Sequence, residues 1–520
     1  MQLTTLDIGV FIAYVIMLIS VAYLVSREPA GHKKNTQDYF LASRGLPWWA
    51  VGASLIAANI SAEQIIGMSG SGYVIGLAIA SYEWMAAITL ILVGKVFLPI
   101  FIERKIYTMP QFLEQRFDSR VRNVMAVFWL GVYVFVNLTS VLWLGALAIN
   151  TVTGIDMLTG MILLGAFSVA YSLYGGLKAV ALTDIIQVVV LVVGGLILTG
   201  ICLSLISSNG GFVSGFGELM AKAPEKFDMI LAKDHPEYMS LPGLSVLIGG
   251  MWIMNLSYWG FNQYIIQRTL AAKSIEEGQA GIVFAAYLKL LMPLIVVVPG
   301  IAAVILAPEL ARPDQAYPTM MQLMPVGIKG LVFAALVAAI VSSLSSMTNS
   351  VSTIFTMDLY SHKYPEKSQE HYVTVGRIVS LTALITAMIC AKPLLGNFEQ
   401  AFQYIQEFTG FFTPGIVALF VLGVFWKRAT VAAALTAAIG SAVFSLLFKL
   451  LWPSLPFIDR VGIVFVLCLV LPAIVVFIQG AKEQENSVSL EGINFKTTSG
   501  FNLGSLGVAL ILAALYATWW

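Results

Sequence analysis

The chain has 520 residues, of which 58% are hydrophobic and 11% are charged, whereas a soluble domain carries about 25% charged residues. This composition excludes an ordinary soluble protein, and a net charge of +1 leaves no basic field that would attract nucleic acid. The hydrophobic residues would fill about fifteen membrane crossings of ~20 residues each, which favours a single transmembrane domain over residues 1–520.

Apolar runs long enough to cross a bilayer predict an all-α polytopic membrane protein with about fourteen transmembrane helices. The first run lacks a basic N-terminal flank and extends over about twenty residues, so we expect a retained span rather than a cleaved signal peptide. The predicted spans are residues 5–26, 47–73, 77–100, 123–150, 155–174, 179–206, 241–268, 278–306, 324–356, 372–392, 397–424, 429–451, 460–479 and 502–520.

Basic residues in the short loops predict the orientation of the chain. The first loop holds Arg27, Lys33, Lys34 and Arg44, and the loop 101–122 holds five further arginines and lysines. The loop between the sixth and seventh spans instead has three lysines against five acids. The positive-inside rule therefore places the first loop and the third, 101–122, in the cytoplasm. An even number of spans then puts both termini outside.

Two predicted spans carry polar residues at the depth of the bilayer centre. Residues 53–72 read ASLIAANISAEQIIGMSGSG, and residues 247–268 read LIGGMWIMNLSYWGFNQYIIQR. Because these spans are five apart, the second enters the membrane from the opposite side, a pattern typical of inverted-repeat transporters with a binding site near the midplane. Close helix packing explains the glycines equally well, but it explains Glu63, Gln64 and Asn255 poorly.

Ionisable and amide side chains inside the predicted spans are candidates for ligand contact, because their burial in lipid is costly. Asn255, Tyr258, Trp259 and Asn262 share one helical face. Amides beside an aromatic ring suit a sugar, whose hydroxyls need donors and acceptors while its C–H face stacks on a ring. For each residue alone, a structural hydrogen bond between helices is an equally good explanation. These polar residues are Asn59, Glu63, Gln64, Glu83, Lys95, Asp184, Asn255, Asn262, Lys289, Gln403, Gln406 and Glu407.

The ninth predicted span contains a short cluster of four serines, Ser342, Ser343, Ser345 and Ser346. Na⁺ is a hard cation that hydroxyl oxygens and free backbone carbonyls can hold. Serines in membrane helices more commonly hydrogen-bond to their own backbone. The residues by themselves leave both interpretations open.

Other classes of function lack a motif in the sequence. No GxxxxGK[ST] phosphate-binding loop is present, which argues against nucleotide-driven pumping. The cysteines, Cys202, Cys390 and Cys468, lie far apart and have neither disulfide nor metal-ligand spacing. No HExxH or GxSxG motif indicates an enzyme. We therefore expect neither enzymatic activity nor a cofactor.

Six stretches in order resemble the solute:sodium symporter family. They are VGASLIAANISAEQ, SYEWMAAITLILVGK, YSLYGGLKAVALTDIIQ, YWGFNQYIIQRTLAAKS, FAALVAAIVSSLSSM and AFQYIQEFTG. The resemblance covers nearly the whole chain and is closest to the bacterial sodium/galactose branch, which is related to the human sodium/glucose cotransporters. It implies a multi-pass protein of the plasma membrane, which in a bacterium is the inner membrane. It implies a LeuT-like fold in which residues 47–206 and 241–424 form two inverted five-helix repeats. Residues 5–26 and 429–520 would then be one peripheral helix before the repeats and three after them.

The resemblance also implies which residues bind the solute and close over it. Tyr258 matches an inner gate that stacks on the sugar ring, and Glu63 and Arg268 match a polar pair with a structural role. The gate residues are Met68, Tyr82, Tyr258 and Phe402. The solute contacts fall on Gln64, Glu83, Asn255, Tyr258, Trp259, Asn262, Lys289 and Gln406.

The sodium site of this fold would also lie at positions present in the chain, which favours the ion-binding interpretation of the serines. Asp184, together with Ser342, Ser345 and Ser346, resembles a second cation site of some members, so a second Na⁺ is a hypothesis. The first site falls on the carbonyls of Ala57, Ile60 and Ala339 and the hydroxyls of Ser342 and Ser343.

The expected function is Na⁺-coupled import of a neutral hexose, galactose or glucose, by alternating access. Ala86 stands where the galactose transporters have a serine, which removes one hydroxyl near the sugar. Alternatives are symport of sialic acid, myo-inositol, proline or pantothenate, and a sugar-gated channel or sensor. A carboxylate solute would favour an arginine at the site, whereas the implied site contains the acid Glu83.

Overall fold

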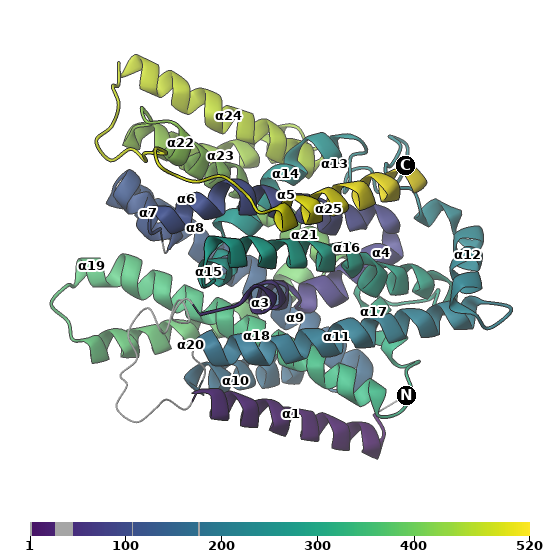
Figure 1. The fold of residues 1–520 in the computed structure, drawn as a ribbon. Coiled ribbons are helices and arrows are strands. Elements are labelled where there is room, and N and C mark those ends of the chain that lie inside the picture. The colour runs from purple at the N-terminus through teal and green to yellow at the C-terminus, as the bar shows by residue number, and fades with distance from the viewer. Residues whose placement is uncertain (1–2, 27–44, 107, 175–176) are drawn as a thin grey trace.

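The computed structural model of the chain describes residues 3–26, 45–106, 108–174 and 177–520. These residues form one bundle of roughly parallel helices, with both ends of the chain at the same end of the bundle (Figure 1). No β-strand occurs in the part of the chain that the structure describes, and the all-α prediction is confirmed there. The basic loop 27–44, on which the orientation partly rests, lies outside the described residues.

Fourteen predicted spans correspond to single helices or to chains of shorter ones. The unbroken helices are α1 (Thr5–Ser26), α10 (Met157–Tyr174), α11 (Leu177–Ile206), α16 (Ile275–Leu306), α20 (Gln369–Leu395), α23 (Val431–Leu451), α24 (Phe457–Ile478) and α25 (Ser499–Thr518). The composite ones are α3 (Trp48–Asn59), η2 (Glu63–Gly67) and α4 (Met68–Val74); η3 (Leu77–Ala80), α5 (Ser81–Leu92), η4 (Val93–Phe97) and α6 (Leu98–Glu103); α8 (Ser119–Val132), η5 (Tyr133–Leu138) and α9 (Thr139–Thr153); α13 (Ser245–Ile248), α14 (Gly250–Phe261) and α15 (Gln263–Leu270); α18 (Ile328–Thr353), η8 (Ile354–Tyr360) and α19 (Ser361–Lys363); and α21 (Ala401–Thr409) and α22 (Thr413–Phe425). Short helices in the connections are α7 (Met109–Arg116), α12 (Phe212–Lys222), η6 (Pro224–Lys226), η7 (Pro313–Gln315) and α17 (Ala316–Met321).

Length and composition identify fewer spans than the sequence predicts. Nine helices in the described part are long and apolar enough to cross a membrane, or eleven if each of two bent pairs counts as one span. The described apolar parts of α1 and α10 are shorter, at Thr5–Val21 and Met157–Tyr171. The span formed by α13, α14 and α15 is divided by its breaks. The membrane character of the bundle is therefore established, whereas a count of fourteen stays a prediction.

The first polar span is broken where its sequence predicts an interruption. α3 and the helix formed by η2 and α4 are bent by 65° relative to each other. Ile60 is extended at the break, with φ −71° and ψ 101°. Its N–H still bonds to the carbonyl of Ile56, whereas the next helix starts with a bond from Ile65 N–H to Ser61 O. A helix end of this kind leaves carbonyl oxygens available to other ligands. In the second polar span, Asn262 is likewise extended between α14 and α15.

A third break was not predicted. α21 and α22 are bent by 42° relative to each other, although residues 397–424 read as one continuous span. Pro414 in the first turn of α22 lacks an N–H, and its ring would clash with the carbonyl of Gly410 in a continuous helix. The break therefore has a local cause in the sequence, which the high apolar content of the segment concealed.

The N-terminal helix is attached to the start of α18 through Asp7. One carboxylate oxygen of this buried residue accepts hydrogen bonds from the N–H groups of Gly327 and Gly330, at 2.7 and 3.1 Å. Its other oxygen lies 3.7 Å from the Lys329 ammonium. An anion is favoured here because the first turn of a helix presents unpaired N–H groups and the positive end of the helix dipole.

We expect Asp7→Ala to lower the free energy of unfolding by about 2–3 kcal/mol, because buried N–H groups of α18 lose their acceptor. Asp7→Asn keeps one acceptor oxygen and should cost less, about 1 kcal/mol. Thermal unfolding of the purified protein in detergent measures both changes. Equal melting temperatures for the Ala variant and the unaltered protein would contradict this role of Asp7.

Candidate functional site

The polar segments of the broken helices surround one cavity in the middle of the bundle. α5, α14, α16, α21 and the two π-helical turns η2 and η5 contribute side chains to its wall. A π-helical turn widens the helix and re-aims its side chains, which is common at functional sites. The wall includes all of the residues for which the family resemblance implies solute contact. They are Gln64, Glu83, Asn255, Tyr258, Trp259, Asn262, Lys289 and Gln406.

A buried ion pair between Glu83 of α5 and Lys289 of α16 lies in this wall. The exposed fractions of the two residues are 2% and 0%, and Nζ of Lys289 lies 2.5 Å from Oε2 of Glu83. The same ammonium donates to Oδ1 of Asn59 and lies 5.0 Å from the Trp259 ring centroid. The pair is neutral as a unit, and both charges remain able to hydrogen-bond to a ligand.

Tyr258 is held in place by hydrogen bonds from two other helices. Its hydroxyl oxygen accepts from Nδ2 of Asn59 at 3.1 Å and from the Tyr264 hydroxyl at 3.0 Å. Nearby, the Tyr133 hydroxyl donates to Oδ1 of Asn262 at 2.9 Å. These bonds connect α3, η5, α14 and α15 on one side of the cavity. The side chain of Tyr258 is therefore fixed by a polar network rather than by apolar packing alone.

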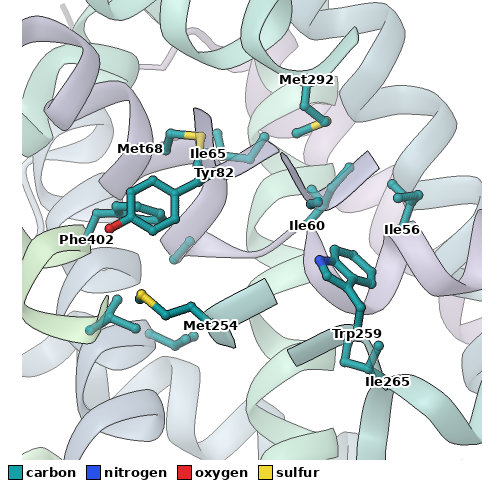
Figure 2. Close-up of a cluster of buried hydrophobic side chains, with 14 of the residues drawn as sticks. Ile56, Ile60, Ile65, Met68, Tyr82, Met254, Trp259, Ile265, Met292 and Phe402 are labelled. Atoms are coloured by element: carbon teal, nitrogen blue, oxygen red, sulfur yellow. The ribbon is translucent and has the colours of Figure 1, made fainter. Parts of the chain in front are cut away.

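The proposed outer cover is apolar and closed. The rings of Tyr82 and Phe402 meet edge to face, with centroids 5.0 Å apart and an interplanar angle of 89°. Figure 2 shows Met68 in the same cluster, with Met254 below the two rings. Met68 is buried at 1% exposure, but it belongs to the packing above the cavity and not to the cavity wall. These contacts close the cavity on the side of the two rings.

Two wall amides have capacity left for a ligand. Oε1 of Gln64 is buried and has no hydrogen-bond partner in the protein. Asn255 donates from Nδ2 to the Met251 carbonyl at 3.1 Å, which aligns its side chain along α14. Buried polar atoms in native proteins are almost always paired, so an unpaired acceptor that faces a cavity indicates a bound ligand or water.

Several wall residues were not predicted. Tyr133 and Asn137 come from η5, and Thr409 and Thr413 come from the ends of α21 and α22. The hydroxyls of both threonines are buried without partners. Asn137 is a single amide inside an apolar span, which is a signal that the sequence could have provided. The tyrosine and the threonines carry no such signal, because both residue types are common in apolar helices.

The implied sodium ligands lie at the break of the first polar span and on α18. Ala57 and Ile60 flank the end of α3, where the helix leaves carbonyl oxygens without their usual N–H partners. Ser342 and Ser343 are buried, at 4% and 7% exposure, and Ala339 precedes Ser343 by one turn on the same face. Hydroxyl and carbonyl oxygens of this kind suit Na⁺ and would not suit a softer metal.

A chain of buried polar contacts connects α18 with α3. Ser342 Oγ donates to Oδ1 of Asp184 at 2.7 Å, and Oδ2 of Asp184 lies 3.4 Å from Nη1 of Arg268. The same Arg268 nitrogen donates to Ser54 Oγ at 2.6 Å. Ser342 and Asp184 of the hypothetical second cation site are thus in direct contact. Ser345 is buried, and the carbonyl of Ser346 accepts a bond from Ser350 Oγ.

The expected pairing of Glu63 with Arg268 is wrong. Arg268 pairs with Asp184, and Oε1 of Glu63 lies 3.5 Å from Nδ2 of Asn137 instead. The 65° bend is the physical reason, because it turns η2 toward η5 and leaves Ser54 of α3 against Arg268.

With this geometry in view, comparison with known proteins decides the family. A sequence model of the Sodium:solute symporter family matches residues 39–440. The chain belongs to this family. Its members couple the movement of a solute to Na⁺, so this symporter is a transporter and Na⁺ is its coupling ion.

Individual relatives resemble the symporter over most of its length. It is 51% identical to the sodium/glucose cotransporter of Vibrio parahaemolyticus, over 100% of this chain and 99% of that protein. It is 34% identical to the sodium/myo-inositol cotransporter 2 of Oryctolagus cuniculus, over 82% of this chain and 67% of that protein. Among solved structures, the substrate-bound outward-open state of a Na⁺-coupled sialic acid symporter matches with a TM-score of 0.76 and 25% identity. That match covers 92% of this chain and 100% of the other.

Proposed function

We propose that this symporter imports a neutral hexose, galactose or glucose, together with Na⁺ by alternating access. The observation that carries the proposal is the wall of the cavity, where the Glu83–Lys289 pair lies beside the amides of Gln64, Asn255 and Gln406. Each of these groups can bond to a sugar hydroxyl, and Tyr258 and Trp259 offer aromatic faces for its C–H groups. The 51% identity to a sodium/glucose cotransporter supports the same solute class.

The charge balance of the site favours a neutral solute over a carboxylate. Lys289 is the cation of the cavity wall, and Glu83 already neutralises it at 2.5 Å. Sialic acid and pantothenate would each bring a net negative charge next to Glu83, and the carboxylate of zwitterionic proline would find no free cation there. Myo-inositol is neutral and stays the principal alternative solute. Ala86 lies in the cavity wall, where the galactose transporters have a serine, so the wall has one hydroxyl fewer to bond to a sugar. The choice between galactose and glucose therefore depends on the other polar side chains of the wall.

Competition for uptake of a labelled hexose into proteoliposomes tests the solute class. Excess galactose, glucose or myo-inositol is added at fixed Na⁺, with sialic acid and proline as negatively charged and zwitterionic competitors. Competition by hexoses alone supports the proposal, and competition by the acids contradicts it. Accumulation against a gradient separates a carrier from a channel or sensor, and uptake that persists when K⁺ replaces Na⁺ would refute Na⁺ coupling.

We expect Gln406→Ala to reduce kcat/KM for the hexose at least a hundredfold, because the loss of bidentate bonds leaves sugar hydroxyls buried and unpaired. Gln403→Ala is the matched control, since Gln403 is one turn away on α21 and does not line the cavity. Initial uptake rates at saturating Na⁺ measure both variants. Equal losses in the two variants would assign the effect to α21 rather than to the sugar contact.

We also propose that one Na⁺ binds the carbonyls of Ala57, Ile60 and Ala339 and the hydroxyls of Ser342 and Ser343. The break after α3 and the burial of the two serines support this site. An ion held between α3 and α18 would stabilise the arrangement that completes the sugar site, and its release would loosen both helices. The membrane potential adds about 2.3 kcal/mol per charge per 100 mV to the driving force.

Ser343→Ala is expected to raise the Na⁺ concentration for half-maximal uptake about tenfold, with a smaller effect on the maximal rate at saturating Na⁺. Ser350→Ala, on the same helix, is the control, because its hydroxyl bonds to the Ser346 carbonyl. Uptake measured over a series of Na⁺ concentrations compares the two. An unchanged Na⁺ requirement in Ser343→Ala would remove this hydroxyl from the site.

A second Na⁺ held by Asp184, Ser342, Ser345 and Ser346 is part of the proposal. The contact of Ser342 with Asp184 supports it, and Arg268 occupies only the other carboxylate oxygen.

The wider architecture is proposed as a LeuT-like bundle of fourteen spans with inverted repeats at 47–206 and 241–424, in a bacterial inner membrane with both termini outside. The breaks at Ile60 and Asn262, in spans five apart, support the repeats. Contacts of Asp7 with Gly327 and of Met229 with Trp519 support termini on one side. Labelling of terminal tags on intact cells with impermeant reagents tests the side.

A further inference from the structure

A short helix in the connection between α16 and α18 inserts a carboxylate between two gate helices. Asp314 lies in η7 and is 1% exposed. Its Oδ2 accepts a hydrogen bond from the N–H of Ala401, the first residue of α21, at 3.1 Å. Its Oδ1 is buried and has no hydrogen-bond partner. On the other side, Asp314 packs against Gly70 of α4 so closely that a Cβ on Gly70 would lie 2.4 Å from Oδ1.

The two helices that meet at Asp314 carry the outer cover of the cavity. Phe402 directly follows Ala401, and Met68 precedes Gly70 by two residues. α4 and α21 also meet through the Ser71 hydroxyl, which donates to Oε1 of Gln400 at 2.9 Å. To open the cavity on this side, α21 must move away from α4. Asp314 cannot keep both of its contacts in that movement.

We propose that Asp314 is a positioning residue of the outer gate, and that a proton on its carboxyl group stabilises the closed gate. The inference assumes the alternating access of the proposed function, but it does not depend on which solute is carried. A protonated carboxyl fills the tight space against Gly70 without placing a charge there. It keeps one oxygen as acceptor for the Ala401 N–H. An ionised carboxylate in the same place would have one oxygen buried and unpaired, which is costly.

The electrostatics of the connection agree with this geometry. Burial raises the pKa of Asp314 to about 7, although the Ala401 N–H and the Arg312 charge lower it. The Arg312 guanidinium donates to the carbonyls of Gly396 and Phe398 and lies over the Trp143 ring of α9, so it is directed away from a close ion pair. Other charged and titratable groups lie on the elements around η7. Glu237 accepts a hydrogen bond from the Gln400 amide, and its own N–H bonds to His235. Lys226 donates to the Val74 carbonyl, and the remaining groups are Arg312 on the same connection, Tyr73 on α4 and Tyr317 on α17.

The sign of the pH effect follows from linkage. When the gate opens, Asp314 meets water and its pKa returns toward the ordinary ~3.9. The closed gate therefore binds the proton more tightly, and it gains stability as the pH falls through 7. Above pH 8 neither state is protonated and the effect ends. Between pH 8 and pH 6 the ratio of closed to open gate should rise about tenfold.

Labelling of a cysteine at a buried position of the gate itself tests the inference in intact cells. The three native cysteines, Cys202, Cys390 and Cys468, are first replaced, and Met68→Cys supplies a single thiol. Three proteins with this thiol are compared: one with the native Asp314, one with Asp314→Asn and one with Asp314→Ala. An impermeant maleimide is applied outside at pH 6, 7 and 8, without solute. The labelling rate of the thiol itself depends on pH, equally in all three proteins. The labelling rate of each protein is therefore divided by the rate of the Asn variant at the same pH, because asparagine imitates the protonated carboxyl group.

The labelling ratio of the Asp314 protein is expected above one at all three pH values and about tenfold higher at pH 8 than at pH 6. The Ala variant should be labelled faster than the Asn variant by the same factor at all three pH values. A flat ratio for the Asp314 protein, or equal rates for Ala and Asn, would overturn the inference. Glu237→Gln, which neutralises the neighbouring acid, should keep the normal pH profile, and loss of the profile there would assign the effect to Glu237 instead.

Discussion

Replacement of Lys289 by Met is expected to abolish solute uptake and to lower the free energy of unfolding by about 3–5 kcal/mol. The ammonium is fully buried and bonds to both Glu83 and Asn59. Without it, the Glu83 carboxylate stays buried at 2% exposure with its charge unpaired. Methionine has a similar length and fills the space, so the loss reports charge pairing rather than a void.

The double variant Lys289→Met with Glu83→Gln separates stability from function. It removes both charges and is expected to recover most of the lost melting temperature, because no unpaired charge is left behind. Uptake should stay absent, since neither the charged acceptor nor the ammonium is available to the sugar hydroxyls. Thermal unfolding and equilibrium binding of labelled hexose measure the two properties. Hexose binding by the double variant at normal affinity would remove the pair from the solute site.

Lipid exposure is so costly for charged groups that hydropathy alone identified Glu83 and Lys289 as functional candidates. The structure places both in one cavity with every other implied solute contact. Hydropathy does not encode which helices are neighbours, however. The ion-pair partner of each charged side chain depends on how the broken helices bend. Arg268 was expected to pair with Glu63, and only the contact of α15 with α3 shows that it is buried against Asp184.

The two helix breaks also differ in whether the sequence predicts them. The break at Ile60 was predicted because Asn59, Glu63 and Gln64 interrupt an apolar run. The break between α21 and α22 was missed because its causes, Gly410 and Pro414, do not lower the hydrophobicity of the segment. Backbone signals therefore have to be weighed separately from polarity in membrane spans.

Arg268→Met is expected to lower the free energy of unfolding by about 3–5 kcal/mol, because Asp184 at 3% exposure loses its only recorded ion-pair partner among the described residues. Asp184→Asn should restore most of this loss in the double variant, since the amide carries no charge and still accepts from the Ser342 hydroxyl. A double-mutant cycle on melting temperatures measures the coupling. Additive effects of the two substitutions would mean that the 3.4 Å contact contributes little.

A different substitution of Asp184, by alanine, tests the second Na⁺. If Asp184 and the serines of α18 hold an ion, Asp184→Ala should lower the measured coupling from two Na⁺ per sugar to one, while the site at Ser343 stays occupied. Coupling is measured from the membrane potential at which net sugar flux in proteoliposomes vanishes. Coupling of one Na⁺ per sugar in the unaltered protein, unchanged in Asp184→Ala, would leave Asp184 with the structural role of connecting Ser342 to Arg268, and through Arg268 to Ser54.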